Sequence, residues 1–233
     1  SKGVTYTDFN VGVLFFYAIS SLAIYGIILA GWASNTKYPF MGSIRSTAQM
    51  VSYELSIGTV FAVIFLCTGS LNFTKIVLAQ QYIWFCIPLF PLFIIFLIAL
   101  LAECNRHPFD LPEAEGELVS GFNTEYSAMG FALFFIGEYG NIIVMSTLIS
   151  ILFCGGWLPL FGLTCIPGII WLCLKICFFI SFYVVVRGAY VRFRYDQLMR
   201  IGWKSLLPLC FGWFIFISGL LLTCNILPNI LCF

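Results

Sequence analysis

Charged residues are scarce in this sequence. Only 9% of its 233 residues are Asp, Glu, Lys or Arg, whereas 61% are hydrophobic. An ordinary soluble domain carries about 25% charged residues, so the composition excludes a water-soluble globular fold. Apolar runs of about 20 residues are long enough to cross the roughly 30 Å hydrocarbon layer of a bilayer as helices. The sequence therefore predicts an all-α, polytopic membrane helical bundle.

Other features that are missing narrow the function. The net charge is +1, and no basic run with interleaved aromatic residues indicates nucleic-acid binding. His107 is the single histidine, and the ten cysteines lie mostly inside apolar runs without a Cys-x-x-Cys pair. Zinc and iron–sulfur sites need clustered ligands at short spacing. No metal site is therefore predicted on this chain, and the cysteines are interpreted as small packing residues.

The apolar runs and the basic residues together predict a topology. Six membrane spans are predicted, at residues 11–33, 49–71, 83–102, 128–153, 166–186 and 206–227. The loops at 34–48, 103–127 and 187–205 then share one face, and they hold eight of the eleven basic residues. Basic loops stay on the cytoplasmic or matrix side of a membrane, so this face is predicted to be the inside.

Three ionisable residues lie within the predicted spans: Glu54, Glu138 and Lys175. A charge at mid-depth costs about 2.5–3.5 kcal/mol on insertion scales, so such residues face protein or water and commonly serve transport. One interpretation is a structural Glu–Lys pair that joins two helices. The other is a hydrated polar path for protons, for which a carboxylate is a suitable carrier.

The predicted inside loop after the third span is acidic. The pattern Asp110-Leu-Pro-Glu113 has the form of a capping box and predicts a short helix that begins after Asp110. That helix is either solvated at the membrane surface or holds a cluster of carboxylates against a partner, with Pro108 and Phe109 as apolar contacts. Six of the ten acidic residues belong to this segment: Glu103, Asp110, Glu113, Glu115, Glu117 and Glu125.

The predicted inside loop at 187–205 is basic and rich in aromatic residues. It is interpreted either as a positive-inside anchor with an interfacial aromatic belt, or as a set of arginines that bind carboxylates of a partner or of the acidic loop. Asp196 lies among these arginines and is expected to pair locally. The loop at 34–48, which contains Arg45, is expected to complete the same surface.

Three long stretches, at 23–54, 102–148 and 192–209, resemble subunit 1 of NADH:ubiquinone oxidoreductase, respiratory complex I. They include AECNRHPFDLPEAEGELVSGFNTEY and RFRYDQLMRIGWKS, in the family's order, and the resemblance extends over essentially the whole chain. The family has eight spans, and this sequence resembles spans three to eight. Residues 1–233 are thus expected to form a single transmembrane domain, with the first two spans on another polypeptide.

The resemblance implies a core membrane subunit that helps to form a ubiquinone-binding cavity and is not catalytic alone. It implies that the chain binds no cofactor, with the iron–sulfur clusters and FMN in partner subunits. The implied partners are the quinone-reducing hydrophilic subunits and the adjacent proton-pumping membrane subunits. The mitochondrial inner membrane is favoured, because many Phe and Cys residues are compatible with an A+T-rich organellar gene. A bacterial plasma membrane is the alternative.

The resemblance also implies roles for individual residues. The expected proton path is Glu54, Glu103 and Glu138. The expected border of the quinone cavity is Asp110, Glu113, Glu115, Glu117, Arg106 and Arg45. The expected basic interface is Arg187, Arg192, Arg194 and Asp196.

Three other functions remain open at this point. The related membrane subunit of hydrogenase-type complexes shares the expected fold, and its partners would distinguish it. A stand-alone proton-coupled transporter would also explain buried glutamates, but it would be expected to show inverted repeats with broken helices, which the sequence does not show. A purely structural anchor for a soluble enzyme leaves Glu54 and Glu138 without a role.

Overall fold

The computed structural model describes residues 7–110, 121–159 and 166–224, and within these ranges all regular structure is helical. The predicted all-α bundle is therefore confirmed. The helices are α1 (Gly12–Ala33), α2 (Lys37–Thr68), α3 (Phe73–Ala79), α4 (Phe90–Glu103), the 3-10 turn η1 (Gly121–Asn123), α6 (Ala128–Phe153), α7 (Gly168–Ala189), α8 (Tyr195–Arg200), the π-helical segment η3 (Ile201–Leu206) and α9 (Leu207–Thr223).

Five helical segments in the described part of the chain are long and apolar enough to cross a membrane: α1, α2, α6, α7 and the continuous run from α8 to α9. The predicted third span is shorter than expected, because α4 has only 14 residues. At 1.5 Å per residue it is about 21 Å long. It begins at Phe90, where Pro91 occupies the first turn, a position that tolerates proline.

Two predicted inside loops are mostly helical. The prediction of a loop at 34–48 was wrong, because α2 already begins at Lys37. In the loop predicted at 187–205, residues 195–205 belong to α8 and η3. The start of α2 is polar, but Gly42, Ser43 and Gln49 are buried. A Cβ on Gly42 would lie 3.1 Å from the Cα of Gly121. Close packing against η1 therefore stabilises the first turns of α2, although their sequence is only weakly apolar.

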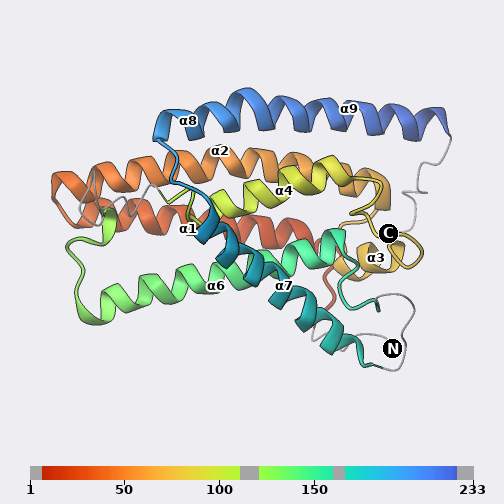
Figure 1. Cartoon of the computed structure of the whole chain (residues 1–233), viewed down its shortest axis with the longest axis horizontal. Coiled ribbons are helices and arrows are strands. Elements are labelled where there is room, and N and C mark those ends of the chain that lie inside the picture. The colour runs from red at the N-terminus through yellow and green to blue at the C-terminus, as the bar shows by residue number, and fades with distance from the viewer. Residues whose placement is uncertain (1–6, 111–120, 160–165, 225–233) are drawn as a thin grey trace.

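Figure 1 shows α2, α4, α1 and α6 running side by side, with α7 crossing them obliquely and α8–α9 covering α2 along one edge. The connections 34–36, 104–110 and 190–194 lie in the left half of this view, and α3 and the turn after α6 lie in the right half. This arrangement agrees with the alternation of loops that the sequence predicted. The core between these helices includes Tyr53, Ile64, Phe96, Ile149 and Phe153, all fully buried.

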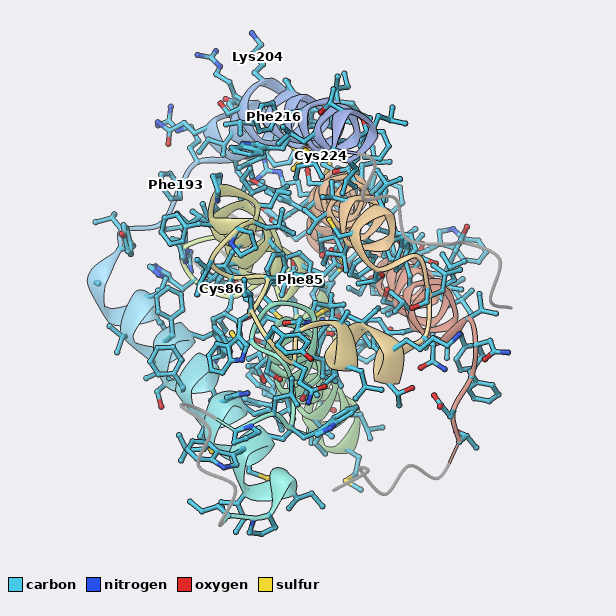
Figure 2. All side chains as sticks on the ribbon, turned by 90° about the vertical axis from the view of Figure 1, so that its right-hand side faces the viewer. Phe85, Cys86, Phe193, Lys204, Phe216 and Cys224 are labelled. Carbon is cyan, nitrogen blue, oxygen red and sulfur yellow. The ribbon has the colours of Figure 1, made fainter. Side chains whose placement is uncertain are left out.

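Many large apolar side chains face outward, as expected of helices that contact lipid. Figure 2 shows Lys204 projecting from the outer edge of the bundle on the α8–α9 run. Phe216, further along this run, is 54% exposed. A soluble protein would not leave so many phenylalanine and leucine side chains in contact with water.

Candidate functional site

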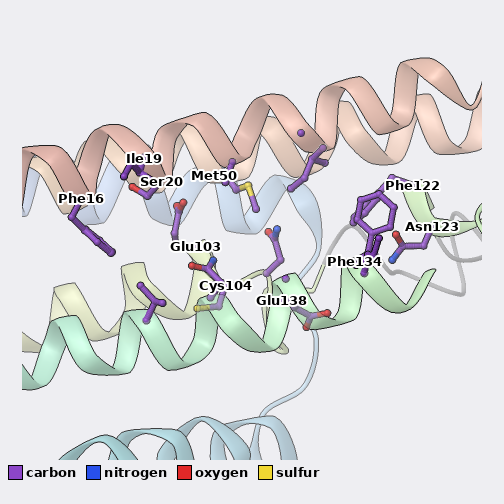
Figure 3. A pocket seen from close by; sticks show the side chains of 18 residues that line it. Phe16, Ile19, Ser20, Met50, Glu103, Cys104, Phe122, Asn123, Phe134 and Glu138 are labelled. Carbon is purple, nitrogen blue, oxygen red and sulfur yellow. The ribbon is translucent and has the colours of Figure 1, made fainter. Parts of the chain in front are cut away.

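A cavity of about 490 Å³ lies between α1 and α6. Its walls are largely apolar, with Phe16 and Ile19 from α1 facing Phe134 and Val144 from α6. The C-terminal end of α4 and the turn η1 also contribute lining residues. Figure 3 shows Glu103 near Ser20 of α1, Cys104 between Glu103 and Glu138 in this view, and Phe122 and Asn123 at one end. This cavity, called the chamber below, is thus apolar with a few polar groups.

Two of the three predicted path carboxylates line this chamber. Glu103 is the last residue of α4 and is only 5% exposed, and its Oε2 atom has no hydrogen-bond partner among the described residues. Glu138 lies on α6, about ten residues from the start of the helix, and is partly buried. Glu103 and Glu138 are the acidic residues among those that line the chamber, and most of the other lining side chains are aliphatic or aromatic.

The third carboxylate lies just beyond Glu103. A second, very small cavity of about 10 Å³ is lined by Glu54, Glu103, Tyr17 and Ser20. This is close to the smallest volume that admits one water molecule. Glu54 sits near the middle of α2 rather than near its inside end, because α2 begins twelve residues earlier than predicted. The structure thus arranges Glu138, Glu103 and Glu54 in series across two adjoining cavities.

Glu138 forms an ion pair with Arg106, which follows α4. The second terminal nitrogen of Arg106 donates a hydrogen bond of 3.1 Å to the hydroxyl of Tyr139, and its Cζ lies 4.9 Å from the centre of that ring. Burial acts to lower the pKa of the Arg106 guanidinium, but the Tyr139 hydrogen bond and the charge of Glu138 outweigh it and raise the pKa overall. Arg106 is therefore a permanent cation beside the chamber.

Lys175 does not pair with either glutamate. Its ammonium group donates to the backbone carbonyls of Cys154 (2.7 Å), Gly156 (2.8 Å) and Leu158 (2.8 Å), and it lies 4.5 Å from the centre of the Trp84 ring. All three N–H donors of the ammonium are used, at the far end of α6 from the chamber. The structural Glu–Lys pair that the sequence left open is therefore not formed.

The turn that carries Arg106 is held from two sides. The side chain of Gln49 donates to the carbonyls of Ala102 and Phe109, at 2.8 Å each. The backbone N–H of Phe193 donates to the carbonyl of Pro108, and the Phe109 and Phe193 rings stack 5.6 Å apart. These contacts attach the turn to α2 and to the connection between α7 and α8.

An ion pair of 3.1 Å joins Arg192 to Asp110. For this pair, the structure supports the interpretation in which the basic segment binds carboxylates of the acidic segment. Arg45 lies 5.9 Å from the centre of the Tyr195 ring and does not line the chamber. Arg187 is in the last turn of α7, Arg194 precedes α8, and Asp196 is in the first turn of α8.

Three predicted residues, Glu113, Glu115 and Glu117, lie outside the described residues, as does the short helix predicted after Asp110. Sequence reasoning assigned no role to Tyr17. The hydroxyl of Tyr17 donates to the carbonyl of Glu54 at 3.0 Å. A tyrosine in the apolar run of α1 was the available signal for Tyr17. Within the described ranges, no group of three or more His, Cys, Asp or Glu side chains is placed to hold a metal ion.

Comparison with known proteins gives a consistent result. A family model described as NADH dehydrogenase matches residues 2–218. The chain is 61% identical to NADH-ubiquinone oxidoreductase chain 1 of Chondrus crispus, with 97% of this chain and 71% of the relative covered. It is 56% identical to the protein of the same name from Arabidopsis thaliana, with 97% and 70% covered. It is also 56% identical to an NADH-quinone oxidoreductase subunit of the bacterium Rhodospirillum centenum, with 98% and 69% covered.

Proposed function

Because the chain belongs to the NADH dehydrogenase family, as a subunit 1 of NADH:ubiquinone oxidoreductase, we propose that its chamber receives ubiquinone and that its carboxylates couple quinone reduction to proton movement. The observation that carries this proposal is the position of Glu103. This one side chain lines both the large chamber and the small cavity that reaches Glu54.

The chamber suits a lipid-soluble quinone. Ligand pockets are commonly about 300–1,000 Å³ and mostly apolar, with a few polar groups that orient the ligand. Here the aromatic and aliphatic walls of α1 and α6 match an isoprenoid tail, and Glu138 and Asn141 provide polar contacts for a head group. Both walls belong to membrane-spanning helices, so a ligand dissolved in lipid is the natural occupant.

The three glutamates support the coupling part of the proposal. Reducing a quinone consumes protons and changes the local charge, and the protonation of neighbouring carboxylates responds to that charge. A change at Glu138 or Glu103 is passed to Glu54 over one water-sized space. The series then leads away from the chamber toward the middle of α2, where a proton-translocating neighbour would receive it.

The subunit acts only within its complex. We propose that the quinone-reducing hydrophilic subunits bind the inside end, where Arg187 lies in the last turn of α7, Arg192 and Arg194 lie in the following connection, and Asp196 lies in the first turn of α8. In this arrangement the iron–sulfur clusters and FMN belong to partner subunits, the proton-pumping membrane subunits lie alongside, and the complex resides in the mitochondrial inner membrane. The acidic residues Asp110, Glu113, Glu115 and Glu117, with Arg45, would contribute to the same partner surface, and Arg106 would act beside the chamber through its ion pair with Glu138.

Replacing Glu138 by Gln tests the coupling role. Glutamine keeps the size and hydrogen-bonding capacity of the side chain but cannot carry a proton. We expect the complex to assemble and NADH-to-ubiquinone turnover coupled to proton pumping to fall about a hundredfold or more, the lower end of the range ascribed to proton-transfer groups. Asp8→Asn, on the far side of the bundle, is the matched control and should leave turnover unchanged. Normal turnover and normal pumping in the Glu138 variant would contradict the proposal.

A further inference from the structure

Arg106 does not line the chamber, yet it binds one of the carboxylates that do. The ion pair is partly buried, with side-chain exposures of 14% for Arg106 and 18% for Glu138. The other end of the guanidinium is occupied by the Tyr139 hydroxyl and lies over its ring. One cation is thus fixed against two consecutive residues of α6.

The position of Arg106 is set by the turn around it rather than by α6. The N–H of Phe109 donates to the carbonyl of Arg106 at 2.9 Å, which closes the turn. Gln49 holds both sides of the turn through the carbonyls of Ala102 and Phe109. The ion pair between Asp110 and Arg192 ties its end to the connection before α8. Any shift of this turn moves the guanidinium relative to Glu138.

A guanidinium beside a carboxylate favours the ionised form of the carboxylate, because arginine itself does not lose its proton in proteins. The fork geometry of arginine also restrains the direction of the carboxylate. Other charged and titratable groups near Glu138 are Asp110 at the end of the turn, Arg187 at the end of α7 and Cys104 at the end of α4. Arg106 is the one that contacts Glu138 directly among the described ion pairs.

We propose that Arg106 is a positioning residue for Glu138: engaged, it favours the ionised form of Glu138 and fixes the direction of the carboxylate at the edge of the chamber, and movement of the 104–110 turn releases Glu138 to accept a proton. This inference rests on the proposed coupling role of Glu138. It adds the means by which the inside surface controls that role. A partner that binds Asp110 or Arg192 would change the same turn and hence the protonation of Glu138.

The test compares Arg106→Gln, Arg106→Lys, Glu138→Gln and the double variant Arg106→Gln/Glu138→Gln in the assembled complex in native membranes. A short-chain ubiquinone is the electron acceptor, and NADH oxidation by an artificial acceptor that bypasses the quinone reports on assembly. Arg200→Gln is the matched control, because Arg200 is exposed on α8 and its replacement removes the same charge from the same face.

We expect Arg106→Gln to lower kcat with ubiquinone about threefold to tenfold, an effect within the range by which directly interacting residues couple. The KM for the quinone should stay unchanged. Arg106→Lys should recover part of the rate, because it keeps the charge and loses the fork. In the Glu138→Gln background, Arg106→Gln should have no further effect, and Arg200→Gln should have none in either background.

The outcomes separate the two hypotheses. If Glu138→Gln lowers the rate but Arg106→Gln does not, or if the effects of the two variants multiply, the positioning role of Arg106 is wrong and the proposed function stands. If Glu138→Gln has no effect, the proposed coupling role itself is wrong. If Arg106→Gln prevents assembly, Arg106→Lys with and without Glu138→Gln gives the same comparison, and multiplying effects there would again overturn the inference.

Discussion

Gln49 illustrates how one polar side chain organises the site. It is fully buried in α2, and its amide group donates to two carbonyls that belong to separate parts of the chain, Ala102 at the end of α4 and Phe109 in the following turn. In an apolar surrounding, water cannot replace a hydrogen-bond donor that these carbonyls lose. Gln49 therefore fixes the turn that carries Arg106.

Replacing Gln49 by Leu should destabilise the inside end of the bundle. The carbonyl of Phe109 would lose its donor, at a cost of about 1–3 kcal/mol, and that of Ala102 would keep only the backbone N–H of Asn105, at 3.3 Å. The measurement is the thermal unfolding midpoint of the purified complex in detergent, which we expect to fall. Gln81→Leu is the control, because Gln81 is exposed. An unchanged midpoint for Gln49→Leu would show that the turn is held by its other contacts.

Glu103 is the residue on which the proposed proton path depends most directly. It is more deeply buried than Glu138, and it is shared by the chamber and the small cavity. In the sequence it is the first acidic residue of a polar loop, and the resemblance to subunit 1 of complex I implied its place in the proton path. Its neighbours across the cavities, Glu54 and Glu138, lie 49 positions before it and 35 after it, so their proximity is a property of the fold.

Packing between α1 and α2 positions one wall of the chamber. Gly31 of α1 lies against Ser43 of α2 so closely that a Cβ on Gly31 would be 2.1 Å from the Ser43 hydroxyl. The hydroxyl of Tyr126 donates to the carbonyl of Ala30 at 3.0 Å and joins the segment before α6 to the same place. The inside ends of α1, α2 and α6 are thus fastened near one point.

Replacing Gly31 by Leu should push α1 away from α2 and widen the chamber at its inside end. We expect weaker quinone binding, seen as an increase in the KM for a short-chain ubiquinone of about threefold or more, since overpacking costs roughly 1–3 kcal/mol. Gly219→Leu on α9 is the control, because no atom lies within 4 Å of the position its Cβ would take. Equal effects of both variants would indicate a general response to helix substitution.

The far end of α6 is stabilised by side chains that donate hydrogen bonds to backbone carbonyls. Gly155 and Gly156 adopt positive φ angles of 71° and 49°, and the ammonium of Lys175 and the amide of Gln80 then satisfy the carbonyls around that turn. The sequence showed a charge deep in a span and suggested a partner carboxylate. A helix end that lacks its own hydrogen bonds is an equally good partner for a buried cation.

The whole molecule is strongly asymmetric. The described segments that carry Arg45, Arg106, Arg187, Arg192 and Arg194 gather on one side, and the opposite side has Asp8 and Lys75. A membrane inserts such a chain with the basic side inside. The chamber reaches η1 and the end of α4 on the basic side, so quinone chemistry and partner binding are expected to share one compartment.

Thiol labelling from one side of the membrane tests this orientation. We expect Val191→Cys to react with a membrane-impermeant maleimide only from the inside and Asp8→Cys only from the outside, since both positions are exposed and their segments lie at opposite ends of the bundle. The unsubstituted chain gives the background, because Cys173, Cys177 and Cys224 are already exposed. Labelling of both variants from the same side would refute the topology.

Apolar runs by themselves determined the class of protein and the approximate spans, and charge asymmetry predicted the inside face, because membrane insertion depends on hydrophobicity and charge that are local in sequence. They did not predict the early start of α2 or the helical α8, since those boundaries depend on burial of polar residues such as Ser43 and Gln49 against distant segments. Only the tertiary structure brought Glu54, Glu103 and Glu138 together, assigned Arg106 to Glu138, and directed Lys175 to backbone carbonyls. Ionic and hydrogen-bonding partners are chosen by proximity in space, and a single sequence does not record which helices will lie side by side.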